Sequence, residues 1–355
     1  MQKLIRGLKN KFKAASFFLF PKRKTAISNI VNLPNNLHKL AVSRNKVSIE
    51  LNLKCNANCI FCSRDASKEN LGFSLDPEEV KDLIDSAKNS GALLIEFSGG
   101  EALLDPHLPD YLDYTHSLGM QTQLITNTLG FSSLSLCQTL LPKLDFLEMS
   151  IPCLDEETYN RLIGRNAFSQ LIRALENVKN SECQKQLFVI VLKSTLPFLL
   201  NTLEFFKDFK NLNSIALMYP YLGGRLFSYP EEYLSFSEIN PYIGSFLKRA
   251  RDLHISVACG NAPLCAFFPY ENLIFVDSKE TSYKKNVARK YSDESISTYK
   301  VESLLLDRVK YPQCDNCIYK ESCYGVREEY KILFNDIEPI TQEKHENRKE
   351  YFSKL

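Results

Sequence analysis

Short apolar segments and longer amphipathic segments alternate along the chain from about residue 46. The short segments predict strands, and the longer ones, which carry apolar residues at helical spacing, predict helices. The predicted strands cover residues 47–53, 92–98, 121–126, 144–151, 187–193 and 213–219. The predicted helices cover residues 76–90, 107–118, 133–142, 155–180, 198–209 and 237–253. Six strand-then-helix units imply an α/β fold with a parallel sheet and right-handed crossovers, and the active site of such a fold lies at the carboxyl ends of the strands.

The first predicted helix has the clearest boundaries. Asp76 is a predicted N-cap, Pro77 occupies the first helical position, and Glu79 completes a capping box. Gly91 is the predicted stop, because glycine readily adopts the left-handed conformation that ends many helices.

The first 24 residues differ from the rest because they contain eight Lys or Arg residues and no acidic residue. Apolar residues fall at helical spacing up to Phe20-Pro21, which predicts a basic amphipathic helix, followed by a linker over residues 25–45. Three interpretations are open. Residues 1–20 contact an anionic membrane surface peripherally, they dock on the chain's own α/β domain or on an acidic leader peptide, or they form a loosely ordered tail.

The alternation of strands and helices is lost after residue 255, so the predicted α/β domain covers residues 46–255. Residues 256–330 hold five cysteines and predict a small second domain. Within this domain, residues 276–300 are polar and charged and predict an exposed insertion. Residues 331–355 are mostly charged and predict a terminal helix or tail.

The bulk composition excludes several classes of protein. A net charge of +2 gives no global electrostatic basis for binding nucleic acid. No run of about 18 uncharged apolar residues is present and the lysine-rich start lacks a signal-peptide pattern, so we expect a cytoplasmic protein without a membrane span. In a reducing compartment, 11 cysteines favour metal sites or buried thiols over disulfides. Three isolated cysteines are interpreted as small buried apolar residues: Cys137, Cys153 and Cys183.

A compact cysteine group follows the first predicted strand. Cys55, Cys59 and Cys62 have C-x3-C-x2-C spacing. Three thiolates on a short loop can hold three irons of a [4Fe–4S] cluster and leave the fourth iron open, which suits catalysis. A zinc site or a chance grouping is the alternative, and the position of the group at a strand end disfavours it.

Glycines and a carboxylate follow the second predicted strand. Gly99 and Gly100 let the main chain approach a ligand closely, and Glu101 places a carboxylate that can hold an ammonium group. By itself this segment also fits an ordinary strand–turn–helix connection. The third and fourth predicted strands likewise end in polar segments, Thr126-Asn127-Thr128 and Glu148-Met149-Ser150.

Together these motifs resemble the radical S-adenosylmethionine (SAM) superfamily over about residues 46–255, with a partial (β/α)6 barrel as the implied fold. The resemblance implies that the three cysteines ligate a [4Fe–4S] cluster whose open iron binds the amino and carboxylate groups of SAM. It places Phe61 near the adenine, and it gives the loop of Gly99, Gly100 and Glu101 to the methionine amino group; Ala102 stands where the family often has proline. Further implied cofactor contacts are Ser98, Asn127 and Ser150, and the segment from Asp155 to Gly164 resembles the family's next helix and its Arg-Gly segment.

A second cysteine group lies near the C-terminus, with C-x2-C-x5-C spacing over residues 314–323 and a further cysteine after Pro263-Leu264. Four thiolates can ligate an auxiliary [4Fe–4S] cluster or a structural zinc ion, and the spacing alone leaves both open. The run resembles the SPASM or twitch extension of radical SAM enzymes. Because Arg327 stands where a full SPASM run has its fourth cysteine, the resemblance implies one auxiliary cluster. The predicted ligands are Cys265, Cys314, Cys317 and Cys323, with Cys259 in reserve.

The resemblance implies reductive cleavage of SAM to methionine and a 5′-deoxyadenosyl radical, with the electron supplied by an external reductant such as flavodoxin or ferredoxin. The C-terminal cysteine run is similar to those of peptide maturases, including the His-Xaa-Ser system type, so the expected substrate is a ribosomal peptide. Two alternatives stay open: a radical SAM enzyme that acts on a small-molecule or lipid-linked substrate, and a non-catalytic iron–sulfur or zinc protein. No residue is predicted as a catalytic acid, base or hydrogen donor.

Overall fold

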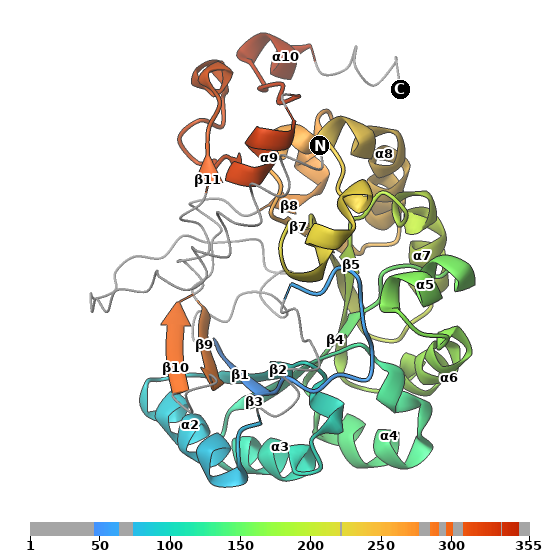
Figure 1. The fold of residues 1–355 in the computed structure, drawn as a ribbon, viewed down its shortest axis with the longest axis vertical. Coiled ribbons are helices and arrows are strands. Elements are labelled where there is room, and N and C mark those ends of the chain that lie inside the picture. The colour runs from blue at the N-terminus through green and yellow to red at the C-terminus, as the bar shows by residue number, and fades with distance from the viewer. Residues whose placement is uncertain are drawn as a thin grey trace.

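A single ten-stranded sheet organises the computed structural model, which describes residues 46–63, 74–220, 222–276, 285–290, 296–300, 308–334 and 336–347. The strand order is β10-β9-β1-β2-β3-β4-β5-β6-β7-β8 (Figure 1). The strands are β1 (Lys46–Asn52), β2 (Leu94–Gly99), β3 (Gln121–Thr126), β4 (Phe146–Ser150), β5 (Gln184–Ile190), β6 (Leu212–Met218), β7 (Ser256–Gly260), β8 (Phe275–Val276), β9 (Lys285–Lys290) and β10 (Ile296–Lys300).

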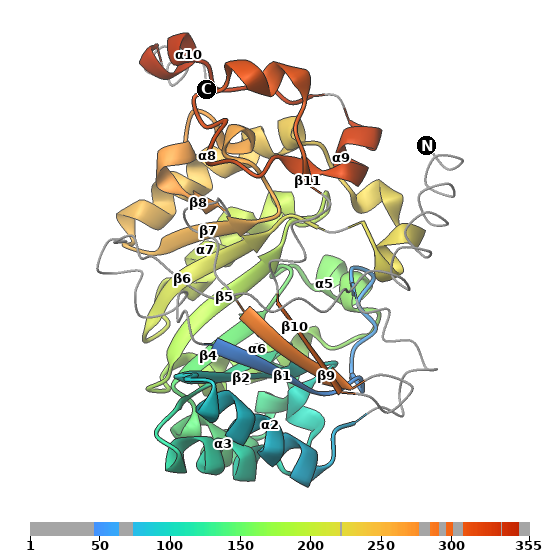
Figure 2. The same cartoon turned by 90° about the vertical axis from the view of Figure 1, so that its left-hand side faces the viewer.

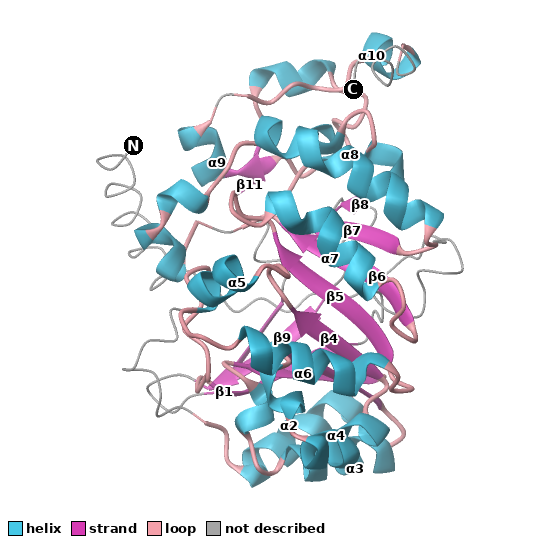
Figure 3. Ribbon diagram, turned by 90° about the vertical axis from the view of Figure 1, so that its right-hand side faces the viewer, coloured by secondary structure: helices cyan, strands magenta, loops and turns pink. Residues whose placement is uncertain are grey.

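Helices cover the outer face of this sheet (Figures 2 and 3). The α-helices are α2 (Pro77–Asn89), α3 (Leu108–Ser117), α4 (Leu134–Leu140), α5 (Glu156–Ile163), α6 (Phe168–Lys179), α7 (Leu199–Phe206), α8 (Phe236–Asp252), α9 (Glu328–Leu333) and α10 (Gln342–Glu346). The predicted start of α2 is confirmed, since Asp76 and Glu79 form the capping box and Pro77 is the first helical residue. Gly91 follows with φ +83°, which is the left-handed conformation expected beyond a helix end.

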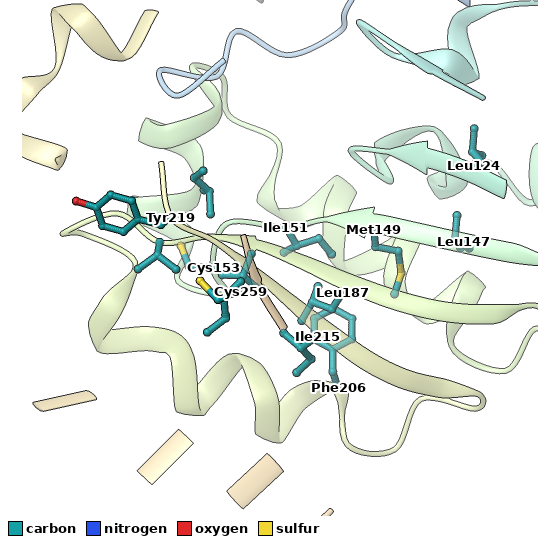
Figure 4. Close-up of a cluster of buried hydrophobic side chains, with 14 of the residues drawn as sticks. Leu124, Leu147, Met149, Ile151, Cys153, Leu187, Phe206, Ile215, Tyr219 and Cys259 are labelled. Carbon is teal, nitrogen blue, oxygen red and sulfur yellow. The ribbon is translucent and has the colours of Figure 1, made fainter. Parts of the chain in front are cut away.

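The hydrophobic core lies between the sheet and its helices. Alternate residues of β1, such as Ile49 and Leu51, are fully buried and join one cluster with Val80 and Ile84 of α2. Figure 4 shows the continuation of this core, where apolar side chains of β3 to β7 gather beside Phe206 of α7. The alternation has a period of two, so the residues between these apolar positions line the other face of the sheet, and in β1 they are polar.

The predicted α/β fold and partial barrel are confirmed. Within the ten-stranded sheet, neighbouring strands from β9 through β8 pair in parallel, and β10 runs antiparallel to its neighbour β9. A separate two-stranded sheet pairs β11 (Arg308–Val309) with β12 (Val326–Arg327) in antiparallel orientation. Within the described ranges β8 and β10 are the two edges, so the sheet curves without closing into a complete barrel.

The single long helix predicted over residues 155–180 is wrong, because two helices occupy this range. The first helix, α5, ends at Gly164, which has φ +67° and whose amide donates to the Arg161 carbonyl. The second helix, α6, begins after Ala167. The helical periodicity runs through both segments, so the break depends on a glycine whose role is visible only in three dimensions.

The sheet also continues beyond the boundary predicted at residue 255. Strands β7 and β8 extend it in parallel past β6. The segment predicted as an exposed insertion over residues 276–300 contributes β9 and β10, and β9 pairs with β1 at the opposite edge. The polar composition of this segment did not predict strands, but its backbone extends the sheet beyond β1.

The two ends of the chain are described only in part. The predicted basic helix of residues 1–24 and the linker to residue 45 lie outside the described residues. In the predicted C-terminal segment 331–355, the structure describes the end of α9 and the short helix α10. Among the described helices, none has the length and apolar character needed to cross a lipid bilayer.

Candidate active site

Cys55, Cys59 and Cys62 lie together on the loop that follows β1, at the carboxyl edge of the sheet, and all three side chains are half-buried. The loop turns tightly, with the Cys62 amide donating to the Cys59 carbonyl at 3.1 Å. The end of α5 holds the loop in place, because the amides of Asn58 and Ile60 donate to the last carbonyls of that helix at 2.8 and 2.9 Å. The last carbonyls of a helix lack partners within the helix, and here those of α5 accept hydrogen bonds from the cysteine loop and fix its position.

Gly164 makes this contact possible. A Cβ atom at Gly164 would lie 2.7 Å from the Asn58 carbonyl oxygen, closer than any side chain permits. The next residue, Arg165, donates from its guanidinium to the Asn56 carbonyl at 2.6 Å. The end of the segment that the sequence analysis assigned to Asp155–Gly164, together with the Arg165 side chain, thus supports the cysteine loop.

A second support comes from the connection after β6. Arg225 donates from its backbone amide to the Cys62 carbonyl at 3.1 Å and from Nε to the Cys59 carbonyl at 2.8 Å, and its guanidinium also contacts Asn58. Gly224 precedes it with φ +53°. No predicted motif included this support, although a glycine pair followed by Arg225 after the sixth strand was the available signal.

The glycine–glutamate loop packs directly against the cysteine loop. Gly99 has φ +143°, and a Cβ atom there would lie 2.4 Å from the Asn52 carbonyl oxygen. A Cβ atom at Gly100 would lie 2.2 Å from the Lys54 carbonyl oxygen. The amides of Gly100 and Glu101 donate to these same two carbonyls at 2.7 Å each, so the glycines are needed for the backbones to meet.

Glu101 is almost fully buried, with 2% of its surface exposed. Its carboxylate accepts hydrogen bonds from the Thr126 hydroxyl at 2.7 Å, the Asn127 amide at 2.8 Å and the Leu103 amide at 3.1 Å. Burial raises the pKa of Glu101, and the three donors act in the opposite direction. The arrangement fixes the carboxylate in a single orientation beside the cysteine loop.

Asn52, at the end of β1, supplies a further polar group that the sequence analysis did not identify. Its amide nitrogen donates to the Glu101 carbonyl at 3.4 Å, and its Oδ1 atom is buried without a hydrogen-bond partner in the described structure. An unpaired buried acceptor next to a fixed carboxylate is suited to an ammonium group. This donor and acceptor set fits the amino group of SAM.

The remaining predicted cofactor contacts lie around the same edge. Asn127 donates to the side-chain oxygen of Asn56 at 2.6 Å and lies 4.0 Å from the Cys55 sulfur. Phe61 is half-buried on the cysteine loop and packs against the core. Ser150 is the last residue of β4, whereas Ser98 lies one residue before the glycines with its hydroxyl 3.4 Å from that of Ser48. The structure thus groups Asn127 and Phe61 most closely with the cysteines.

Two thiols of this loop, those of Cys55 and Cys59, lie in an environment that opposes their ionisation. Burial raises the pKa of Cys55, with a smaller contribution from the negative charge of Glu101. Burial, together with the neighbouring Cys55 and Cys62, raises the pKa of Cys59 to about 12. A positive metal centre would reverse this balance, because metal binding favours thiolates. The donor set of three adjacent thiols fits a [4Fe–4S] cluster with one open iron.

The predicted C-terminal cysteines also come together. Cys265, Cys314, Cys317 and Cys323 line one small pocket with Gly325. Burial raises the pKa of Cys265, and Cys323, Cys317 and Cys314 raise it further. Within the described ranges no group of three or more His, Cys, Asp or Glu side chains converges closely enough to hold a single metal ion.

The other cysteines lie apart from both groups. Cys259 is buried on β7 with its sulfur 3.5 Å from the Gly260 carbonyl oxygen, and it does not line the pocket of the four C-terminal cysteines. Cys137, Cys153 and Cys183 are buried in the core, as interpreted from the sequence. Cys259, the reserve candidate, is therefore less suitable than Cys265 as the fourth ligand.

Comparisons with known proteins agree with the observed fold. Residues 49–206 match the family model of the radical SAM superfamily. SuiB of Streptococcus suis bound to S-adenosylmethionine has a similar fold, with a TM-score of 0.56 and 14% identity over 79% of this chain and 72% of that one. SuiB bound to its precursor peptide SuiA gives a TM-score of 0.52 and 14% identity over 86% of this chain and 73% of that one.

A further solved structure, native anSMEcpe with bound AdoMet and Kp18Cys peptide, gives a TM-score of 0.48 and 16% identity. The match covers 60% of this chain and 63% of the length of anSMEcpe. This chain therefore spans less than two thirds of that protein's length. The matched domain contains the cysteine loop, the glycine–glutamate loop and the helices that support them. Residues 49–206 of the chain are therefore similar to the radical SAM superfamily.

Proposed function

We propose that the chain is a radical SAM enzyme that modifies a ribosomal peptide by hydrogen abstraction. When bound, a [4Fe–4S] cluster and SAM supply methionine and a 5′-deoxyadenosyl radical after one-electron reduction by an external donor such as flavodoxin or ferredoxin, and the radical takes a hydrogen atom from the substrate. The observation that carries the proposal is the cysteine loop at the carboxyl edge of the sheet, held by the Gly99-Gly100 loop, the end of α5 and Arg225.

The residues around the loop have distinct roles in this proposal. Cys55, Cys59 and Cys62 hold the cluster, and their sulfurs lie on a loop whose backbone is fixed from three sides. Glu101 and the Oδ1 atom of Asn52 hold the amino group of SAM, since both are buried acceptors next to the loop. Burial of Cys55 and Cys59, which raises their pKa values, also limits the access of water to this loop.

The peptide substrate is proposed from the C-terminal cysteine run and from the similarity to SuiB, which has been solved with its precursor peptide SuiA. We propose further that Cys265, Cys314, Cys317 and Cys323 hold one auxiliary [4Fe–4S] cluster, with zinc as the alternative. Arg327 occupies the position of a missing fourth cysteine in the run, and it forms a buried ion pair with Glu329 instead. That pairing agrees with one auxiliary cluster rather than two.

Anaerobic reconstitution with iron and sulfide tests both parts of the proposal. We expect about eight irons per chain, because each cubane holds about four, and 5′-deoxyadenosine after addition of dithionite and SAM. The triple variant C55A/C59A/C62A should retain about four irons and form no 5′-deoxyadenosine. C137A, which removes a thiol outside both groups, serves as the matched control. About four irons plus one zinc in the wild type would keep the enzyme and assign zinc to the C-terminal site.

A further inference from the structure

A short chain of hydrogen bonds connects the end of β3 to the buried carboxylate of Glu101. The Thr126 hydroxyl donates to Oε1 of Glu101 at 2.7 Å, and the same hydroxyl oxygen accepts from the Thr128 amide at 2.9 Å. Both threonines are buried. Because β2 and β3 are parallel neighbours, their carboxyl ends bring these residues together at one edge of the sheet (Figure 1).

The Thr128 amide determines the direction of the Thr126 hydroxyl. A hydroxyl group has one hydrogen to donate and accepts through its lone pairs. The Thr128 amide occupies the accepting side of the Thr126 oxygen, which leaves the single hydrogen for Glu101. Asn127, between the two threonines, donates from its own amide to Oε2 of Glu101 at 2.8 Å. The turn at residues 126–128 thus presents two donors to one carboxylate.

This turn requires a left-handed backbone conformation at Thr128, where φ is +73° and ψ is −19°. A branched Cβ atom makes this conformation unfavourable. The other non-glycine residues with positive φ in the described part of the chain, Asn211, His254 and Asn261, are of types that adopt it more readily. The Thr128 hydroxyl has no hydrogen-bond partner in the described structure, so the strained turn is not maintained by a polar contact of that side chain.

The two carboxylate oxygens of Glu101 are used unequally. Oε1 accepts two hydrogen bonds, from the Thr126 hydroxyl and from the Leu103 amide at 3.1 Å. Oε2 accepts one, from the Asn127 amide. A carboxylate offers about four acceptor positions, about two on each oxygen, so the position left open by the described residues lies on Oε2. Oε2 is therefore the oxygen that is available to an ammonium group.

We infer that Thr126 and Thr128 are positioning residues, which fix Glu101 so that Oε2 faces the amino group of SAM. The inference rests on the proposed function, in which Glu101 holds that amino group. Thr126 anchors Oε1, and the left-handed turn at Thr128 supplies the amide that orients the Thr126 hydroxyl. Both threonines act through Glu101, so the carboxylate is oriented before the ligand arrives.

The same turn is connected to the cysteine loop. The Asn127 side chain accepts from the Leu129 amide at 3.1 Å through Oδ1 and donates to the Asn56 side chain at 2.6 Å. One segment therefore sets the position of the Glu101 carboxylate and contacts the loop that carries Cys55, Cys59 and Cys62. This connection suits a ligand that binds the carboxylate and the cluster at the same time.

Equilibrium dialysis of labelled SAM against the full, reconstituted chain tests the role of Thr126. T126V has nearly the same shape but lacks the hydroxyl, and we expect roughly tenfold weaker SAM binding, as for one hydrogen bond to a charged group. T126S restores the hydroxyl and should restore the affinity. T202V, which removes a buried threonine hydroxyl of α7, is the matched control and should bind SAM as the wild type does. Iron content should be the same in all of these variants.

Variants at Thr128 separate the backbone from the side chain. T128V keeps the branched shape without the hydroxyl and should bind SAM as the wild type does. T128G adopts the left-handed conformation without steric cost and should also keep the affinity. T128P has no amide hydrogen and cannot adopt a positive φ, so it should weaken SAM binding as T126V does.

Hydrogen exchange of the peptide covering residues 126–129 gives a readout that needs no ligand. In T126V the Thr128 amide loses its acceptor, so this peptide should exchange faster than in the wild type and in T126S. Unchanged exchange in T126V, wild-type SAM affinity in T126V, or a lower iron content in T126V would each overturn the inference, whether or not T128P folds. If the wild type binds no SAM, the proposed function fails, and the exchange result alone decides whether these threonines fix Glu101.

Discussion

Gly224 packs so tightly against Cys62 that a Cβ atom on Gly224 would lie 2.3 Å from the Cys62 carbonyl oxygen. The contact joins the connection after β6 to a loop that is more than 150 residues away in the sequence. The backbone position of the cysteine loop, and with it the geometry of the three thiols, therefore depends on the absence of a side chain at Gly224.

Replacing Gly224 with alanine should therefore disrupt the first cluster selectively. The substitution adds about 1–2 kcal/mol of left-handed backbone strain, together with the clash against Cys62. We expect G224A to load about four irons rather than about eight and to form little 5′-deoxyadenosine. G91A is the matched control, because Gly91 has a similar φ of +83° but nothing within 4 Å of its Cβ position. Full iron loading in G224A would show that the loop tolerates the displacement.

Arg225 should control how firmly the cluster is held. R225K keeps the positive charge but loses the hydrogen bond from Nε to the Cys59 carbonyl. One lost hydrogen bond of about 0.5–1.5 kcal/mol predicts roughly two- to tenfold faster loss of iron to a chelator. R249K, at an arginine paired with Glu204 on the protein surface, should lose iron at the wild-type rate. Equal rates for both variants would limit Arg225 to a packing role.

Cys59 should be unreactive in the folded, metal-free chain. Its pKa is raised from 9.0 to about 12, so at pH 8 only about one molecule in ten thousand carries the thiolate. We expect mass spectrometry to show slow alkylation by iodoacetamide near pH 8, faster alkylation at higher pH, and ordinary reactivity after unfolding in guanidinium. Rapid alkylation of the folded chain at pH 8 would contradict the raised pKa.

The same shift predicts how the stability of the metal-free chain depends on pH. A thiol whose pKa is higher in the folded state contributes stability that is complete below its ordinary value of 9.0 and is lost as pH rises towards 12. Denaturant unfolding should therefore give a lower free energy of unfolding at pH 10 than at pH 8. The variant C59A should show a smaller decrease across this range, and an unchanged decrease would assign the effect to other groups.

Glu101 should matter for SAM binding and not for cluster loading. E101Q preserves the shape of the side chain but removes the charge, and its amide cannot accept from both the Asn127 and Leu103 amides as the carboxylate does. A charged hydrogen bond of about 1.5–3 kcal/mol predicts roughly tenfold to hundredfold weaker SAM binding, with iron content unchanged. Because burial raises the pKa of Glu101, wild-type SAM binding should also weaken as the solution becomes acidic and the carboxylate is protonated.

The choice between Cys265 and Cys259 can be decided by iron counting. C265A should lose about four irons, since Cys265 lines the pocket with Cys314, Cys317 and Cys323. C259A should keep all of them, because its thiol lies in the core on β7. The opposite result would make Cys259 the fourth ligand.

Patterns local to one segment predicted much of this structure. The strand–helix alternation gave the fold, and the capping box of Asp76 and Glu79 gave the start of α2. Cysteine spacing and Gly99-Gly100-Glu101 identified the residues that meet at the carboxyl edge of the sheet. Each strand, helix, cap or motif behind these signals lies within a short run of consecutive residues, which is why a single sequence reveals it.

Contacts between distant segments could not be predicted in this way. The helix break at Gly164 and the placement of Arg225 depend on backbone atoms of the cysteine loop, which no periodicity encodes. Asn52 was missed because a polar residue at a strand end is ordinary until its unpaired oxygen is seen beside Glu101.

The pairing of β9 with β1 has a consequence for how the chain folds. Lys46 and Lys285 are register partners separated by roughly 240 residues, so this ladder forms only after most of the chain has been synthesised. Until then, the strand that leads into the cysteine loop presents an unpaired edge, which invites pairing with other chains. The antiparallel pair of β9 and β10, which is synthesised late, thus covers the edge of β1. Nascent chains that end before residue 285 lack this pair, so the edge of β1 next to the cysteine loop stays open in them.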